Sequence, residues 1–176
     1  MGVHRHSHHA RLRAALLGTT ALVVVSVAVL AGAEPAAAQS YDWGGPGSTT
    51  TTPIYNLNTN WANPPTGAPP IAAGQSAVFD TNGSNTVTVT TPVAPDSWTF
   101  NAGAQSYNFS GAAVNFSLAG PTGGIINNAS ADQTIANSIG ESVAGVQVQH
   151  FGGGVLTFRA TIHIRAVRSF RSARCR

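Results

Sequence analysis

The side chains best able to support acid–base chemistry in residues 39–158 are one histidine, His150, and five carboxylates. The carboxylates are Asp42, Asp80, Asp96, Asp132 and Glu141. Nucleophilic catalysis needs a base beside an activated Ser or Cys. The stretch "GQSAV" around Ser76 lacks the second Gly of a Gly-x-Ser-x-Gly elbow, so Ser76 is interpreted as an ordinary strand-edge residue. We therefore predict no catalytic residue.

The five acids are dispersed, and their spacing leaves a glycosidase-type pair of carboxylates open. The four Asp residues lie beside turn-forming residues, where Asp commonly supports the backbone. His150 precedes Phe151 and is expected to mark a strand end. A single His without Cys or clustered acids does not form a metal site, so we expect no metal and no cofactor.

Charge is distributed very unevenly along the chain, whose formal net charge is +3. Residues 39–158 contain the five acids and no Lys or Arg, whereas residues 159–176 contain six Arg. The only cysteine, Cys175, lies in this basic tail, so no disulfide can form within residues 39–158. The tail leaves a nucleic-acid binder open as a minor alternative, but we expect no nucleic-acid partner.

The first 38 residues have the layout of a secretory signal peptide: a basic start, an apolar stretch and a small-residue cleavage motif. Ala36 and Ala38 occupy the −3 and −1 positions, so we predict cleavage before Gln39. The alternative is a retained membrane anchor, because the apolar stretch approaches the ~20 residues that span a bilayer. The expected partner is the Sec export machinery, and we assign no metal to "HRHSHH".

Short strands separated by turns fill the region that follows. The stretch 85–91, "NTVTVTT", alternates Val and Thr and predicts a half-buried strand. Similar patterns follow at 97–100, 106–110, 113–118, 123–128, 133–139, 145–151 and 153–158. No stretch sustains a helical period. Residues 39–72 are Pro-, Gly- and Thr-rich and are interpreted as an N-terminal cap or lead-in containing Trp43, Tyr55 and Trp61.

Two all-β architectures suit this pattern, an antiparallel β-sandwich and a solenoid of stacked coils. The scarcity of charge favours the solenoid, because strands in register place like charges above one another. Asn also recurs beside the strands, as expected if it formed ladders or turns: Asn101, Asn108, Asn115, Asn127, Asn128 and Asn137. We predict a solenoid over 73–158 with roughly five coils of about 20–25 residues.

Most of 61–158 resembles the N-terminal passenger of bacterial autotransporters with autotransporter-associated β-strand repeats. The resemblance is carried by "NWANPPTGAPPIAAGQSAVFD", "APDSWTFNAGAQSYNFSGAAVNFS", "GGIINNASADQTIANSIG" and "GVQVQHFGGGVLTF". It implies a right-handed parallel β-helix exported through a Sec signal. It also implies a surface adhesin or structural stalk, although some passengers carry enzymes, and a C-terminal outer-membrane barrel that is not evident in this chain.

The same resemblance gives an explanation of the basic tail, 159–176. After "GGGVLTF" a further repeat of the type Ser-Gly-x-Asn-Thr-Tyr-Ser-Gly-Gly-Thr is expected, but "RATIHIRAVRSF" follows. Codons compatible with Phe158 to Arg171, regrouped by one base, translate as SGNNTYSGGTIIS. We therefore interpret the tail as out-of-frame translation after loss of one T at the Phe158 codon.

These observations predict a non-enzymatic exported passenger fragment, which is adhesive or structural at the cell surface in the intact protein. Its expected partners there are surface glycans, host surfaces or abiotic surfaces. The truncated chain is expected in the periplasm. The alternative is a small secreted carbohydrate-binding or hydrolytic β-domain in which exposed Trp43, Trp61 and Trp98 stack on sugars.

Overall fold

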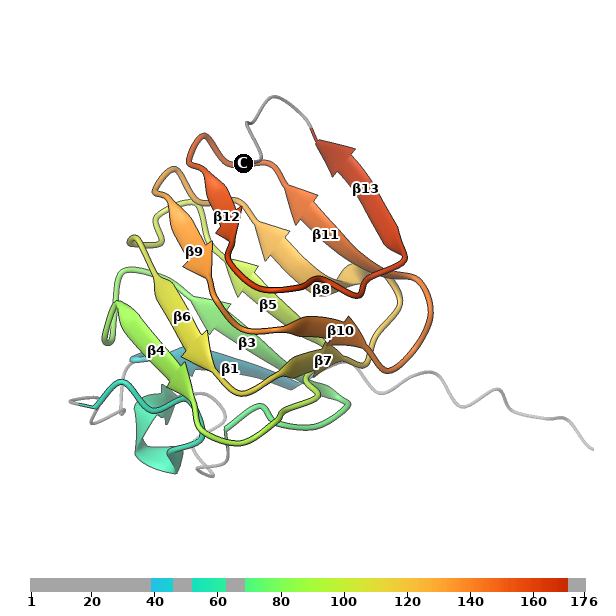
Figure 1. Ribbon diagram of the computed structural model, residues 1–176. Helices are drawn as coiled ribbons and strands as arrows, with labels where there is room; N and C mark the ends of the chain where they lie inside the picture. The colour runs from blue at the N-terminus through green and yellow to red at the C-terminus, as the bar shows by residue number, and fades with distance from the viewer. Residues whose placement is uncertain (1–38, 46–51, 63–68, 171–176) are drawn as a thin grey trace, which may run out of the picture. The chain divides into compact units, whose positions relative to one another are not determined.

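The structure, a computed structural model, describes residues 39–45, 52–62 and 69–170, the last five without their side chains. Thirteen strands in these residues form three sheets, here named A, B and C (Figure 1). Sheet A consists of β2 (Trp61–Ala62), β1 (Gln39–Trp43), β3 (Gln75–Phe79), β5 (Ser97–Phe100), β8 (Gly120–Asn127), β11 (Val146–His150) and β13 (Ala166–Phe170). Sheet B consists of β4 (Thr86–Val89), β6 (Asn108–Gly111), β9 (Gln133–Ile135) and β12 (Leu156–Phe158). Sheet C consists of β7 (Val114–Phe116) and β10 (Ile139–Glu141).

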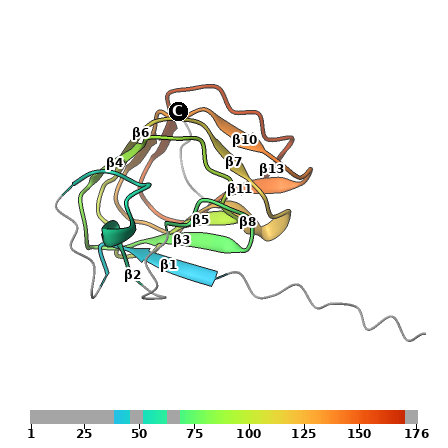
Figure 2. The same cartoon turned by 90° about the horizontal axis from the view of Figure 1, so that it is seen from below.

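The chain passes through sheets A, B and C in turn and then returns to sheet A one level further along, which makes a parallel β-helix of about four turns (Figures 1 and 2). Every strand pair is parallel except β1 with β2. The predicted solenoid fold is therefore confirmed, with about four turns in place of the roughly five coils expected, and the antiparallel sandwich is wrong. Adjacent sheet C levels also align Val93 with Val114 and Ile139 with Ile162.

Alternation along each strand explains which side chains fill the interior. Val87 and Val89 of β4 point inward and are almost completely buried. Thr86 and Thr88, which alternate with them, face outward. The same two-residue period buries aromatic side chains in β3, β5 and β6. Phe79 stacks on Phe100 of the next level at 5.2 Å between ring centroids.

Coil length varies, which explains why the sequence shows no strict repeat. Hydrogen bonds between neighbouring levels join residues 21 apart at Ser97 and Ser76 but 28 apart at Gln149 and Pro121. Strand β8 contains much of the extra length, because its register against β11 shifts between Val146 and Gln147. The extra residues are accommodated without breaking the parallel ladder.

Segments 39–45 and 52–62 close the first end of the solenoid. Strand β1 adds in parallel to β3, and β2 returns antiparallel along β1 after a 3₁₀ turn at Asn58–Asn60. Ile54 bridges to Thr88 of sheet B. The antiparallel strand β2 is therefore the last strand of sheet A on this side.

Residues 159–170 continue the solenoid beyond β12. The Arg159 N–H donates to the Ile135 carbonyl at 2.8 Å, and the His163 N–H donates to the Ile139 carbonyl at 2.7 Å. Ile164 packs against the core, and Ala166–Phe170 forms strand β13 beside β11. Ile162 and Ile164 lie two residues apart, so they match the inward spacing of sheet C.

Candidate functional site

A hollow of about 140 Å³ lies at the first end of the solenoid. It is lined by Asp42, Trp43, Gly45, Val78, Asp80, Asn82 and Asn101. Asp42 comes from β1, whereas Asp80 and Asn101 follow directly after β3 and β5. Parallel stacking therefore brings together two of the five dispersed acids.

The two carboxylates of the hollow have different environments. Asp80 accepts hydrogen bonds from the Thr81 N–H at 2.9 Å and from the Asn101 amide nitrogen at 2.9 Å. Partial burial, together with the nearby charge of Asp80, raises the pKa of Asp42 above its usual value of 3.8. Asp80 thus holds the turn, and Asp42 is the carboxyl whose ionisation this environment disfavours.

Asp96 and Asp132, predicted to support the backbone at turns, instead form hydrogen bonds to residues 21 and 23 positions later in the chain. Asp96 accepts a hydrogen bond from the Ser117 hydroxyl at 2.8 Å, and Asp132 accepts one from the Val155 N–H at 2.8 Å. Both bonds join neighbouring levels of the solenoid. These carboxylates therefore connect one coil to the next.

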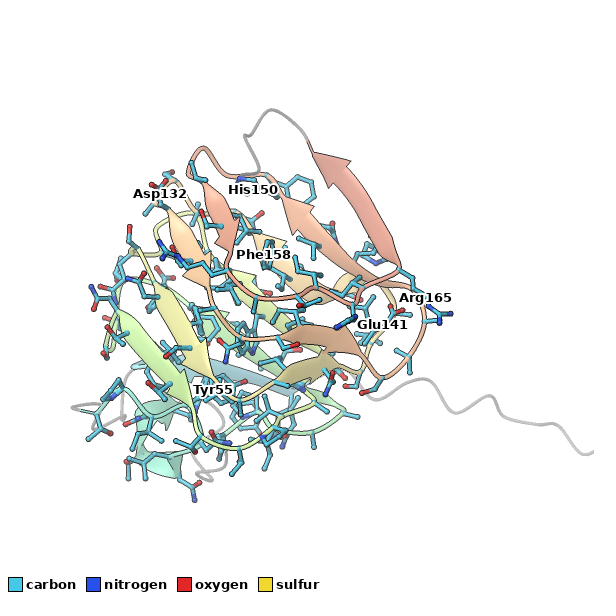
Figure 3. All side chains as sticks on the ribbon, viewed as in Figure 1. Tyr55, Asp132, Glu141, His150, Phe158 and Arg165 are labelled. Carbon is cyan, nitrogen blue, oxygen red and sulfur yellow. The ribbon has the colours of Figure 1, made fainter. Side chains whose placement is uncertain are left out.

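Glu141 lies on β10, where it aligns with Phe116 of the neighbouring strand β7, and only 9% of its side chain is exposed. One carboxylate oxygen, Oε1, is 4.0 Å from Nε of Arg165, whose side chain is 88% exposed (Figure 3). The other oxygen, Oε2, is buried and accepts no hydrogen bond. A residue of the basic tail is therefore the counter-ion of this acid.

His150 is fully buried and ends β11, as predicted. Its Nε2 lies 2.9 Å from the Gly154 carbonyl oxygen, which can only accept, so Nε2 carries the proton. The Nδ1 atom is buried without a partner. The residue aligned with His150 on β8 is Asn127, whose buried Nδ2 also lacks a partner.

Ser76 and His150 do not form a nucleophile–base pair. Ser76 lies on β3 and its hydroxyl oxygen accepts a hydrogen bond from Ser97 at 3.0 Å. Strands β5 and β8 separate β3 from β11 in sheet A. Within the described ranges, no three His, Cys, Asp or Glu side chains lie close enough to share a metal ion.

The expectation that three tryptophans are exposed for sugar stacking is wrong. Trp43, Trp61 and Trp98 are only 1%, 4% and 0% exposed. Their ring N–H groups donate to internal oxygens: the Ser84 carbonyl, the Tyr55 carbonyl and the Tyr55 hydroxyl, respectively. They belong to an aromatic cluster in which Phe79 of β3 and Tyr55 connect Trp98 to Trp61. An amphipathic Trp can be buried in this way once its N–H has an acceptor.

Three of the six recurrent Asn residues, Asn101, Asn127 and Asn137, form side-chain hydrogen bonds in the described residues, and none of these bonds joins Asn to Asn. The Asn137 amide donates to the Ala112 carbonyl at 2.7 Å, and the Asn127 oxygen accepts from the Ala129 N–H at 3.0 Å. Asn115 aligns with Gly140, so Asn does not stack on Asn there. Variable coil lengths displace these residues from a common position.

The outer face of sheet B is a further candidate surface, which the sequence analysis did not single out. It presents six neutral polar side chains, none of which hydrogen-bonds elsewhere in the described residues: Thr86, Thr88, Asn108, Ser110, Thr134 and Thr157. We call this set the sheet B face. The Val–Thr alternation at 86–89 was its only local signal, because the other members come from separate coils.

The predicted cleavage residues Ala36 and Ala38 lie outside the described residues, and Gln39 begins β1. No α-helix occurs in the part of the chain that the structure describes, and so none there could cross a membrane. Comparisons with protein-family models, with curated protein sequences and with solved structures find no match.

Proposed function

We propose that this chain is an exported, non-enzymatic β-solenoid, the passenger region of an autotransporter, with an adhesive or structural role at the cell surface. The observation that carries the proposal is the division between interior and exterior. Apolar and aromatic side chains fill the interior, while neutral polar side chains of successive coils lie on the outer side of sheet B. Such a fold offers an extended surface for contact with other surfaces.

Export through the Sec machinery is supported by the signal-peptide layout of the first 38 residues. The test is expression of the full chain in a Gram-negative host, followed by fractionation and N-terminal sequencing. We expect a periplasmic product that begins at Gln39, and a product that stays in the inner membrane with residues 1–38 attached would contradict this.

The out-of-frame origin of residues 159–176 remains a prediction about the gene. Sequencing across the Phe158 codon tests it. A downstream sequence that regroups into the expected repeat would support the passenger assignment. Codons that cannot be regrouped would make the tail a genuine part of the coil, in keeping with its contacts through Ile164 and Arg165.

The adhesive role is tested by coating beads with the purified chain and measuring their retention on glycan-coated, cell-covered and plastic surfaces under flow. We expect retention that disappears when the protein is unfolded before coating, because the outer faces exist only in the folded solenoid. Equal retention of folded and unfolded protein would contradict a specific surface role. The Trp-stacking alternative is not favoured, because all three rings are buried.

A further inference from the structure

The sheet B face combines two features: its six polar side chains have no hydrogen-bond partner in the described residues, and the strand register aligns them from coil to coil. In the turns, polar side chains are used to hold the fold, as Asn101 does with Asp80 and Ser117 with Asp96. On the outer side of sheet A, the hydroxyls of Ser76 and Ser97 bond to each other. The hydroxyl and amide groups of the sheet B face are left available to a ligand.

The register places these groups on a regular grid. Thr86 aligns with Asn108, Asn108 with Thr134, and Thr134 with Thr157, so one polar group follows another along the solenoid axis. Neighbouring strands are about 4.7–4.9 Å apart. Thr88 and Ser110 form a second, shorter row, two residues along the strands and therefore roughly 6.6–6.8 Å away.

We propose that the sheet B face binds a neutral polysaccharide whose chain runs along the solenoid axis, with about one sugar residue per coil. This inference rests on the proposed adhesive function and names its surface and its ligand class. The spacing between strands is close to the advance of an extended β-linked sugar chain per residue. Hydroxyl and amide groups both donate and accept, so they match sugar hydroxyls.

Charge selects a neutral polymer over an anionic one. The sheet B face contains no charged residue, and among side chains that the structure describes the only Arg residues are Arg159 and Arg165 of the last coil. An anionic chain along the axis would meet neutral polar groups on three coils and a single cation, Arg159, two residues beyond Thr157 on the last coil. Since the three tryptophans are buried, recognition relies on hydrogen bonds, and affinity must accumulate along the ligand.

The experiment measures binding of the purified full chain to cello-, xylo- and manno-oligosaccharides from disaccharide to hexasaccharide, with oligogalacturonate as the anionic comparator. We expect affinity for at least one neutral series to rise with length up to the tetrasaccharide, since the longer row has four members. Loss of one hydrogen-bonding group in Asn108→Ala or Thr134→Ala should weaken binding about fivefold.

The matched control is Thr122→Ala, which removes an exposed hydroxyl from β8 of sheet A. It should bind as the unsubstituted chain does, and all three variants should unfold at the same urea concentration. Equal binding by all variants, a preference for oligogalacturonate, or no binding to any neutral series would overturn the inference. If the coated beads were still retained on surfaces while one of these results was found, the adhesive function would hold and only its assignment to the sheet B face would be wrong.

Discussion

At the residue scale, Asn127 and His150 form a polar interruption in an aromatic column. Phe79, Phe100, Asn127 and His150 align on successive strands of sheet A. The Asn127 side-chain oxygen accepts a hydrogen bond from the Ala129 N–H, and the His150 Nε2–H donates one to the Gly154 carbonyl. A buried donor and a buried acceptor therefore remain on neighbouring residues, and each is costly if it stays unpaired.

We expect the Asn127 amide to donate to Nδ1 of His150, directly or through a water molecule. Nitrogen-15 NMR should find His150 as the neutral Nε2–H tautomer, with an Nδ1 resonance that moves in Asn127→Ala. A protonated Nδ1 would contradict the pairing.

His150→Phe should lower the free energy of unfolding, measured in urea, by about 1–3 kcal/mol, because it leaves the buried Asn127 amide without an acceptor. The double change Asn127→Phe/His150→Phe should recover part of that loss.

Asp42 provides a prediction about pH. Its pKa is raised by partial burial and by Asp80, so the folded state holds this proton more strongly than the unfolded state does. Stability is therefore gained as the pH falls through the folded pKa and lost above it. Asp42→Asn should stabilise the chain at neutral pH by less than about 1 kcal/mol, because partly exposed charges interact weakly.

This advantage should disappear as the pH falls below 3.8, the ordinary pKa, where Asp42 is protonated in both states. Urea unfolding of both proteins across the acid range measures the difference. If the free energies of unfolding of the unsubstituted chain and of Asp42→Asn differed by the same amount at every pH, the raised pKa of Asp42 would be wrong.

At the element scale, each coil depends on tight connections between its strands. Strand β6 ends at Gly111, whose φ of 101° lies in the left-handed region. A Cβ at this position would also overlap the carbonyl oxygen of Val89 on the preceding coil. The chain turns from sheet B toward sheet C here because glycine permits both the backbone angle and the close approach.

We therefore expect Gly111→Ala to lower the free energy of unfolding by at least about 2 kcal/mol, from backbone strain and overpacking together. Gly153→Ala is the matched control, because a Cβ at that position meets no atom within 4 Å. Urea unfolding measures both variants. Similar losses in the two would show that the connection at Gly111 tolerates a side chain.

At the scale of the whole molecule, stability in a solenoid is carried by contacts between neighbouring coils. Strands β5 and β8 have a partner on each side, whereas β12 has one only on the side of β9 among the described strands. Hydrogen exchange followed by mass spectrometry should show protection that is highest in β3, β5 and β8 and lowest in β12 and β13. Uniform exchange throughout would instead indicate that the solenoid opens as a single unit.

The sequence by itself determined the local features of this protein. Alternation in "TVTV" and "SWTF" established strands and their inward residues, because neighbouring side chains of a strand always point to opposite faces. Scarce charge and recurrent turns favoured stacked coils over a sandwich. The end of a strand at His150 and the turn role of Asp80 also followed from local chemistry.

Only the tertiary structure decided which residues meet across coils. Contacts between levels join residues 21 to 28 apart, and this variation hides the register that aligns Asn127 with His150 or Asn108 with Thr134. Burial of Trp98 beneath Tyr55, 43 residues away, is likewise invisible locally. Local alternation indicates whether a side chain faces inward or outward, whereas long-range backbone hydrogen bonding determines which residue of the next coil lies beside it.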